Sequence, residues 1–208
     1  MGLFDSLKKV VNSEVKHAIN SSAHNAINDI SKGISKTVSE VIDNKSEKIS
    51  FASLPKNLSE LQALKESSLD TPFKTAALAM AVLCNYENDA NATFEMLDFL
   101  KGPESVNEFE KQFFSDRLKG KAYKPFSFFE GATAENGYKP SVPYTIVVSD
   151  NKYSYTDEVW ATLYVKSAGA DSKEPIKLRK KPSTGQWFIN DIQCLTDIRI
   201  PVADDPWA

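Results

Sequence analysis

The stretch TPFKTAALAMAVLCN, residues 71–85, is apolar on nearly every side when it is drawn as a helix. Asp70 or Thr71 can cap this helix, and Pro72 suits its first turn, where the missing backbone donor costs nothing. A helix without a polar face is buried on several sides. Residues 73–85 are therefore predicted to form the central helix of the core.

Three more segments show apolar residues three or four positions apart, which is the spacing of an amphipathic helix. The shortest covers residues 57–64, with Asn57 as its cap and Glu60 three residues further on. The other two cover residues 90–100 and 105–118, and each ends close to a glycine. Together with residues 73–85 they predict a layer of helices.

The second half of the chain contains strand patterns instead. Residues 144–149, 158–167, 175–181 and 186–190 are rich in β-branched or alternating apolar residues and are separated by turn residues. An extended segment at residues 197–202 is predicted to add to the sheet. Helices followed by consecutive strands predict an α+β fold in which the helical layer packs on an antiparallel β-meander.

A connection rich in aromatic residues joins the helices to the strands. It covers residues 121–143 and is interrupted by glycine and proline. Its large rings favour one of two roles, which are to fill the open end of a curved sheet or to line a ligand pocket. The rings concerned are Tyr123, Phe126, Phe128, Phe129 and Tyr138.

The N-terminal part differs in character from the rest. Residues 1–48 lack proline, tryptophan and tyrosine, and their apolar residues recur every three to four positions. The predicted organisation is an amphipathic helical extension at 1–48, a tether with a short helix at 49–70, and an α+β body at 71–208.

Charge and composition exclude several classes of protein. The 208 residues include 25 Lys and Arg against 28 Asp and Glu, which gives a net charge of −3. Such a balance makes nucleic acid an unlikely partner, because a general nucleic-acid binder needs a concentrated basic face. No apolar run is long enough to span a membrane, and the start does not match a secretory signal. A cytoplasmic location is therefore predicted.

The residue types that carry most enzyme chemistry are scarce. Cys84 and Cys194 each lie among apolar residues and are predicted to be buried free thiols. Both histidines, His17 and His24, fall in the N-terminal extension, so the body lacks the imidazole that assists serine or cysteine nucleophiles. We therefore expect no catalytic residue, no metal site and no cofactor, and enzymatic activity is not favoured.

The strongest cationic cluster is KLRKK, residues 177–181. On an alternating strand Lys177, Arg179 and Lys181 share one face, where such charges commonly give solubility and protect an edge strand. The run itself contains no aromatic residue for base stacking, which disfavours a nucleic-acid or phosphate role.

The first residues carry the sharpest functional signal. The segment GLFDSLKKVV, residues 2–11, resembles amphipathic membrane peptides of the aurein and citropin kind. That resemblance implies a helix lying in a bilayer interface. Two roles are compatible with the apolar stripe. It can attach the protein to the inner face of the membrane, or it can bind a second copy of the chain or another protein. The predicted binding residues are Leu3, Phe4, Leu7, Val11 and Val15.

Several short sequence segments in the body resemble those of a family of bacterial proteins catalogued as a domain of unknown function. They include DTPFKTAA at 70–77, FLKGP at 99–103 and DIRIP at 197–201. The resemblance covers residues 52–208 and implies a compact α+β body in a bacterial cytosol. It implies no activity, cofactor or catalytic residue.

Helices followed by a meander with a tryptophan-containing hairpin are also similar to the cystatin-like cone of the nuclear-transport-factor fold. Two functions are compatible with these patterns. The favoured one is a non-enzymatic binding or scaffold module, whose N-terminal helix mediates self-association, docking to a partner or membrane attachment. The alternative is a small-molecule-binding or hydrolytic cone-fold domain, which would need a deep pocket with a desolvated carboxylate.

Overall fold

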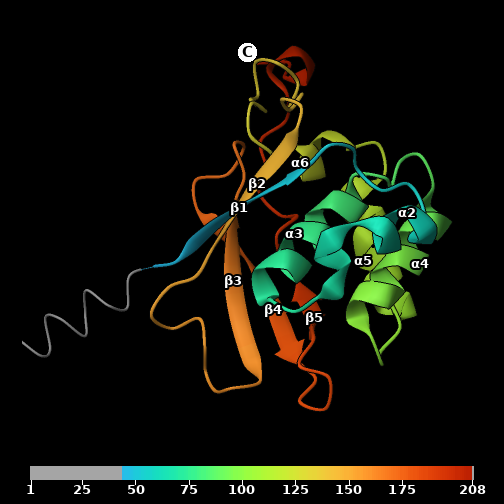
Figure 1. Cartoon of the computed structure of the whole chain (residues 1–208). Coiled ribbons are helices and arrows are strands. Elements are labelled where there is room, and N and C mark those ends of the chain that lie inside the picture. The colour runs from blue at the N-terminus through green and yellow to red at the C-terminus, as the bar shows by residue number, and fades with distance from the viewer. Residues whose placement is uncertain (1–43, 208) are drawn as a thin grey trace, which may run out of the picture. The chain divides into compact units, whose positions relative to one another are not determined.

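The computed structural model of the protein describes residues 44–207. Positions 1–43 of the predicted N-terminal helix, including its stripe of apolar residues, lie outside the described residues. The described part contains helices and one five-stranded antiparallel sheet, so the predicted α+β class is confirmed. The helices gather on one side of the sheet (Figure 1).

Helix α3 (Pro72–Leu83) is the centre of the core, as the sequence predicts. The Thr71 side chain caps it by accepting a hydrogen bond from the Lys74 backbone amide at 3.3 Å. Every residue of the helix except Lys74 is buried. The helix contacts all five strands as well as α4, which explains why it has no polar face.

The remaining helices surround α3. They are α2 (Leu58–Ala63), the 3-10 helix η1 (Lys65–Ser68), α4 (Ala90–Lys101), α5 (Glu108–Leu118) and the short α6 (Tyr123–Phe126). Asn57 caps α2 as predicted, accepting from the Glu60 amide at 2.9 Å. Helix α5 starts later than predicted, because Asn107 and Glu110 form a reciprocal capping box that fixes its first turn.

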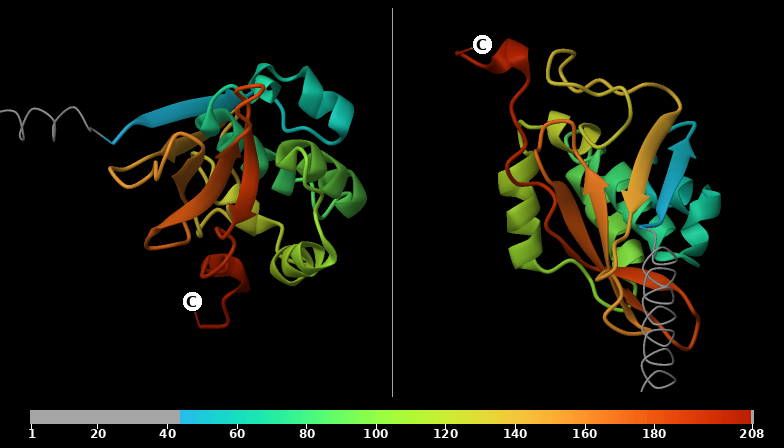
Figure 2. Two further views of the ribbon diagram at one scale, coloured as in Figure 1. Left: turned by 90° about the horizontal axis from the view of Figure 1, so that it is seen from below. Right: turned by 90° about the vertical axis from the view of Figure 1, so that its left-hand side faces the viewer.

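The sheet is a simple meander. Strands β1 (Ser46–Phe51), β2 (Tyr144–Ser149), β3 (Trp160–Lys166), β4 (Lys173–Lys180) and β5 (Trp187–Ile192) lie in sequence order, each antiparallel to the next. The right-hand view of Figure 2 looks onto the face of the sheet that the described helices leave open. The residues that face the helices include Ile49, Phe51, Ile146, Val148, Ala161, Leu163, Val165, Ile176, Leu178 and Ile189, all of which are buried.

Strand β1 is the element that the sequence patterns did not predict. It crosses the boundary expected at residue 48, and it pairs with β2 along its whole length. Ile49 and Phe51 from β1 are buried, and so are Leu61 and Leu69 further on. The predicted tether is therefore part of the body, because its apolar side chains pack in the same core. The short run SEKISF has only two strongly apolar residues, so its alternation is easily missed.

The predicted strand at 197–202 is not present. The Arg199 backbone amide donates to the Gly169 carbonyl at 3.0 Å, and the Val202 amide donates to the Ala134 carbonyl at 3.0 Å. These bonds reach two different loops, so no strand ladder forms. The chain then turns into the 3-10 helix η2 (Val202–Asp204).

The aromatic connection closes the sheet where strands β2 and β3 separate. These two strands pair at only two positions, and Phe129 forms a bridge to Ile146 beside them. Tyr138 is 1% exposed, and its hydroxyl donates to the Arg199 carbonyl at 2.9 Å. Because Phe128 and Phe129 are also buried, these three rings fill the interior, whereas the partly buried Phe126 lines a hollow beside Cys84.

Candidate functional site

The predicted binding residues Leu3, Phe4, Leu7, Val11 and Val15 lie outside the described residues. The chemistry available to the body is therefore set by residues 44–207. Within this range no group of three or more His, Cys, Asp or Glu side chains is placed to hold a metal ion. None of its helices reaches the length and hydropathy that a membrane crossing requires.

The two cysteines are buried free thiols, as predicted. Burial raises the pKa of both the Cys84 and the Cys194 thiol. The Cys194 sulfur lies 3.4 Å from the sulfur of Met80 in the core. A thiol that is buried and protonated packs like a small apolar residue and is a poor nucleophile.

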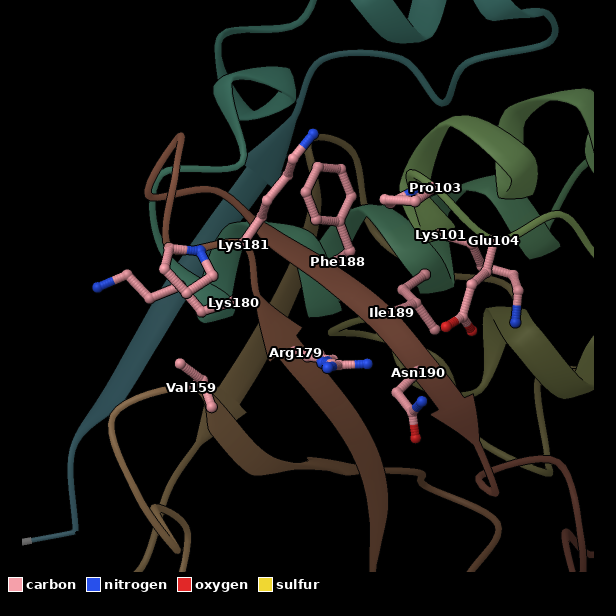
Figure 3. A pocket seen from close by; sticks show the side chains of 11 residues that line it. Lys101, Pro103, Glu104, Val159, Arg179, Lys180, Lys181, Phe188, Ile189 and Asn190 are labelled. Atoms are coloured by element: carbon pink, nitrogen blue, oxygen red, sulfur yellow. The ribbon is translucent and has the colours of Figure 1, made fainter.

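A first hollow, which we call the basic cleft, opens at one end of the β4–β5 hairpin (Figure 3). Its walls come from the end of β4, from β5 and from the turn after α4. The volume of the cleft is about 320 Å³. The lining residues are Lys101, Pro103, Glu104, Val159, Arg179, Lys180, Lys181, Pro182, Phe188, Ile189 and Asn190.

Three of the cations in the basic cleft are not neutralised within the described residues. Neither Arg179, Lys180 nor Lys181 forms an ion pair with any carboxylate in residues 44–207. The Arg179 guanidinium lies over the Trp160 ring, 5.0 Å from its centroid, and Lys180 lies 5.8 Å from the centroid of Trp187. A cation held over an aromatic face keeps its charge and its donors available.

Phe188 forms the apolar wall of the basic cleft, and the turn after α4 is shaped around it. Gly102 ends α4 with φ +69°, a conformation that favours glycine. A Cβ at this position would collide with the Phe188 ring. The glycine therefore allows the ring to lie against the backbone, which fixes one wall of the cleft.

The sequence predicts the cations of the basic cleft but not the aromatic rings beside them. Ile176 and Leu178 face the core while Lys177 and Arg179 are exposed, so the predicted faces of the basic run are confirmed. The expected role in edge protection does not hold, because β4 is an inner strand paired with β3 and β5. The missing aromatic rings come from the neighbouring strands. Across the sheet Arg179 pairs with Trp160 on one side and with Phe188 on the other.

A second hollow, which we call the acidic groove, lies along helix α5 at the other end of β4 and β5. Its volume is about 630 Å³. Phe109 at its side is 81% exposed, and Phe113 one turn further on is partly buried against Phe114. The lining residues are Phe109, Glu110, Phe113, Phe114, Glu174, Pro175, Asp191, Ile192, Gln193 and Thr196.

The three carboxylates of the acidic groove differ in how they are paired. Glu110 accepts from the Lys101 ammonium at 2.6 Å, and Asp191 lies 3.9 Å from the ammonium of Lys177. Glu174 has no ion-pair partner among residues 44–207. Partial burial raises the pKa of Glu174, and the nearby charge of Asp197 adds to this. A cation placed beside Glu174 would remove that penalty.

The basic cleft and the acidic groove are two hollows of opposite charge on the surface of an α+β domain. The chain belongs to the family described as a domain of unknown function, DUF6935, whose model matches residues 53–202. This confirms the family resemblance seen in the sequence. No curated protein and no solved structure matches the chain significantly.

Proposed function

We propose that this protein is a non-enzymatic binding or scaffold module of the cytoplasm that self-associates through its N-terminal amphipathic segment. The apolar stripe of that segment enters the acidic groove of a second copy. The binding residues on the segment are Leu3, Phe4, Leu7, Val11 and Val15.

The observation that supports the proposal most strongly is the aromatic surface on helix α5. Phe109 is 81% exposed although it stands beside a groove whose floor includes Phe113 and Phe114. Covering a phenylalanine is worth on the order of 1.5–3 kcal/mol, so an apolar partner gains by binding there. An amphipathic helix in such a groove is a common way to recognise a peptide segment.

The charges of segment and groove are complementary. The stripe is flanked by Lys8, Lys9 and Lys16 against Asp5 and Glu14, which leaves an excess of one positive charge. The groove contains three carboxylates, of which Glu110 and Asp191 already have a lysine partner. Glu174 is the carboxylate that lacks an ion-pair partner within residues 44–207. A lysine ammonium beside it would compensate its charge, which favours a basic amphipathic segment over a neutral one.

The alternative, a small-molecule-binding or hydrolytic cone-fold domain, finds less support. It requires a deep pocket inside the sheet, and that space holds the buried rings of Phe128, Phe129 and Tyr138. The Tyr138 hydroxyl is already bonded to a backbone carbonyl, so its role is to stabilise the fold.

Light scattering of the full-length protein over a range of concentrations tests the proposal. The wild type is expected to form an oligomer that dissociates on dilution. Leu7→Asp places a charge in the stripe, and Phe109→Ser removes the exposed ring, so each should shift the protein to a monomer. Tyr153→Ser is the matched control, because Tyr153 is 74% exposed but lies outside the groove.

A wild-type monomer at every concentration would contradict self-association. So would an oligomer that persists in both Leu7→Asp and Phe109→Ser. Sedimentation with anionic vesicles separates the remaining alternative, attachment to the membrane surface. If Leu7→Asp abolishes vesicle binding while Phe109→Ser leaves it unchanged and the protein is monomeric, the stripe serves a membrane and the groove does not receive it.

A further inference from the structure

We propose that the basic cleft binds a small nucleotide-like ligand, in which a phosphate group is attached to a flat base with amino groups. This inference does not depend on the proposed self-association, because it rests on the opposite end of the β4–β5 hairpin. Three properties of the cleft support it: its available cations, its aromatic wall and its rim of amide and carboxylate groups.

The cations supply the phosphate site. The Arg179 side chain forms no ion pair and donates no hydrogen bond within residues 44–207, so its planar set of N–H donors is free. Its position over Trp160 holds the guanidinium in one orientation. In Figure 3, Arg179 and Lys181 lie on either side of Phe188, whereas the Lys180 amine points away from them. A molecule that lies along the Phe188 ring can therefore meet a cation at either end of the ring.

The opposite side of the basic cleft has an apolar wall and a polar rim. Phe188 offers an aromatic surface that the contact with Gly102 keeps in place, and Val159 and Ile189 extend it. Asn190 supplies both a donor and an acceptor, and Glu104 supplies an acceptor at the rim. A carboxylate at this position repels a second anionic group, but it accepts hydrogen bonds from an amino group. A base with an exocyclic amine fits this side better than a plain aromatic acid does.

The size and rigidity of the site agree with a ligand of this kind. A volume of about 320 Å³ lies at the small end of the range found for small-molecule sites. The backbone of the walls belongs mainly to two paired strands and a capped helix end, so little backbone entropy is lost on binding. The charge balance also limits the partner. Only a short stretch of the sheet is basic on a chain of net charge −3, which favours a single nucleotide over a long nucleic acid.

Titration calorimetry on the full-length protein with three probes tests the inference. The probes are AMP, ribose 5-phosphate, which lacks the base, and adenosine, which lacks the phosphate. AMP is expected to bind more tightly than either of the other two, and its affinity should fall as salt is added. The fluorescence of Trp160 next to Arg179 should change on AMP binding, and this change should disappear in Trp160→Phe.

Two variants and one matched control locate the site. Arg179→Gln is expected to weaken AMP binding about tenfold or more, since a charge-assisted hydrogen bond is lost. Lys177→Gln removes the same charge from the same face of the same strand but lies outside the cleft, so it should bind AMP like the wild type. Lys181→Gln provides a second test in case Arg179→Gln disturbs the fold, which thermal melting will reveal.

Failure to bind AMP at millimolar concentration would overturn the inference. Equal losses in Arg179→Gln and Lys177→Gln would also overturn it, because the effect would then reflect net charge alone. If ribose 5-phosphate binds as tightly as AMP, the base has no site on Phe188 and the proposed ligand class is wrong. None of these results bears on the acidic groove, so the two proposals fail separately.

Discussion

Helices α3 and α5 have nearly the same length, yet they differ in almost every other respect. Of the 12 residues of α3, Lys74 alone is not buried, whereas of the 11 residues of α5 only Phe114 and Leu118 are buried. Helix α3 contacts every strand of the sheet. Helix α5 carries Phe109 into solvent beside the acidic groove.

The contrast separates the residues that hold the fold from those available for binding. Side chains that face α3 gain their free energy from burial within this chain, so changing them destabilises the body. Phe109 is largely exposed and gains little free energy from the fold, so its ring is available for the binding proposed above. Changes to α3 and its contacts should therefore cost much more stability than changes to the exposed face of α5.

The largest effect is expected from removing β1, which packs against α3. A protein of residues 44–208 should melt cooperatively. A protein of residues 52–208 loses the buried side chain of Ile49 and that of Phe51, each worth about 1.5–3 kcal/mol, along with six paired positions. That loss is comparable to the whole stability of a domain, so the shorter protein should not melt cooperatively in calorimetry. A sharp, unchanged transition would show that β1 is dispensable.

The next effect concerns a side chain at the centre of α3. Leu78 is 0% exposed, and Leu78→Ala is expected to lower the free energy of unfolding by about 2–5 kcal/mol through lost burial and a cavity. Lys74→Ala on the same helix is the control. It removes a 2.8 Å surface pair with Asp70 and a 3.5 Å hydrogen bond to the Ser68 hydroxyl, and it should cost less than about 1 kcal/mol. Urea denaturation measures both, and equal costs would remove α3 from the core.

A smaller effect depends on pH. Burial raises the pKa of Glu174, so the folded protein holds this proton more tightly than the unfolded chain does. The resulting stabilisation is present below the ordinary pKa of glutamate and is lost as the pH rises through the folded pKa. Glutamine resembles the protonated form. Glu174→Gln should therefore be more stable than the wild type at pH 7 and equal to it at about pH 3.

The exposed Glu108, paired with Lys111 at 2.7 Å, serves as the control for this pH series. Glu108→Gln should show no gain in thermal stability at pH 7. If Glu174→Gln proves less stable than the wild type at pH 7, the carboxylate already has a stabilising partner in the folded protein.

The smallest effect on stability is expected on α5. Phe109→Ser should change the free energy of unfolding by less than about 0.5 kcal/mol, because the ring is 81% exposed in the folded body. Chemical denaturation at a concentration where the protein is monomeric measures this change in the free energy of unfolding without any contribution from association. A cost of several kcal/mol would mean that Phe109 belongs to the fold.

Most of the fold could be predicted because its local signals are strong. The apolar run of α3, the Asn57 and Thr71 caps and the alternation in β3 each act over a few neighbouring residues. The predictions for strand β1 and for the segment at 197–202 are wrong because contacts distant in the sequence decide their structure. The partners of β1 lie about a hundred residues away in β2, and the segment at 197–202 bonds to two separate loops.

The surface sites were less predictable, because each is assembled from several elements. The basic run was visible, but its aromatic neighbours Trp160 and Phe188 come from strands on either side. The acidic groove likewise joins α5 to residues such as Glu174 and Asp191 in the hairpin. In the structure Trp160 is partly exposed next to the buried Ala161. Only the register of the sheet shows which cation it meets.

Binding of the N-terminal segment to the acidic groove is tested most directly by titrating a synthetic peptide of residues 1–20 into isotope-labelled protein of residues 44–208 and following the amide signals by NMR. We predict saturable binding, with the largest shifts on α5 and at the adjoining ends of β4 and β5. Binding should be lost in Phe109→Ser and kept in Tyr153→Ser. No binding, or binding that Phe109→Ser leaves unchanged, would contradict the claim that the acidic groove receives the N-terminal segment.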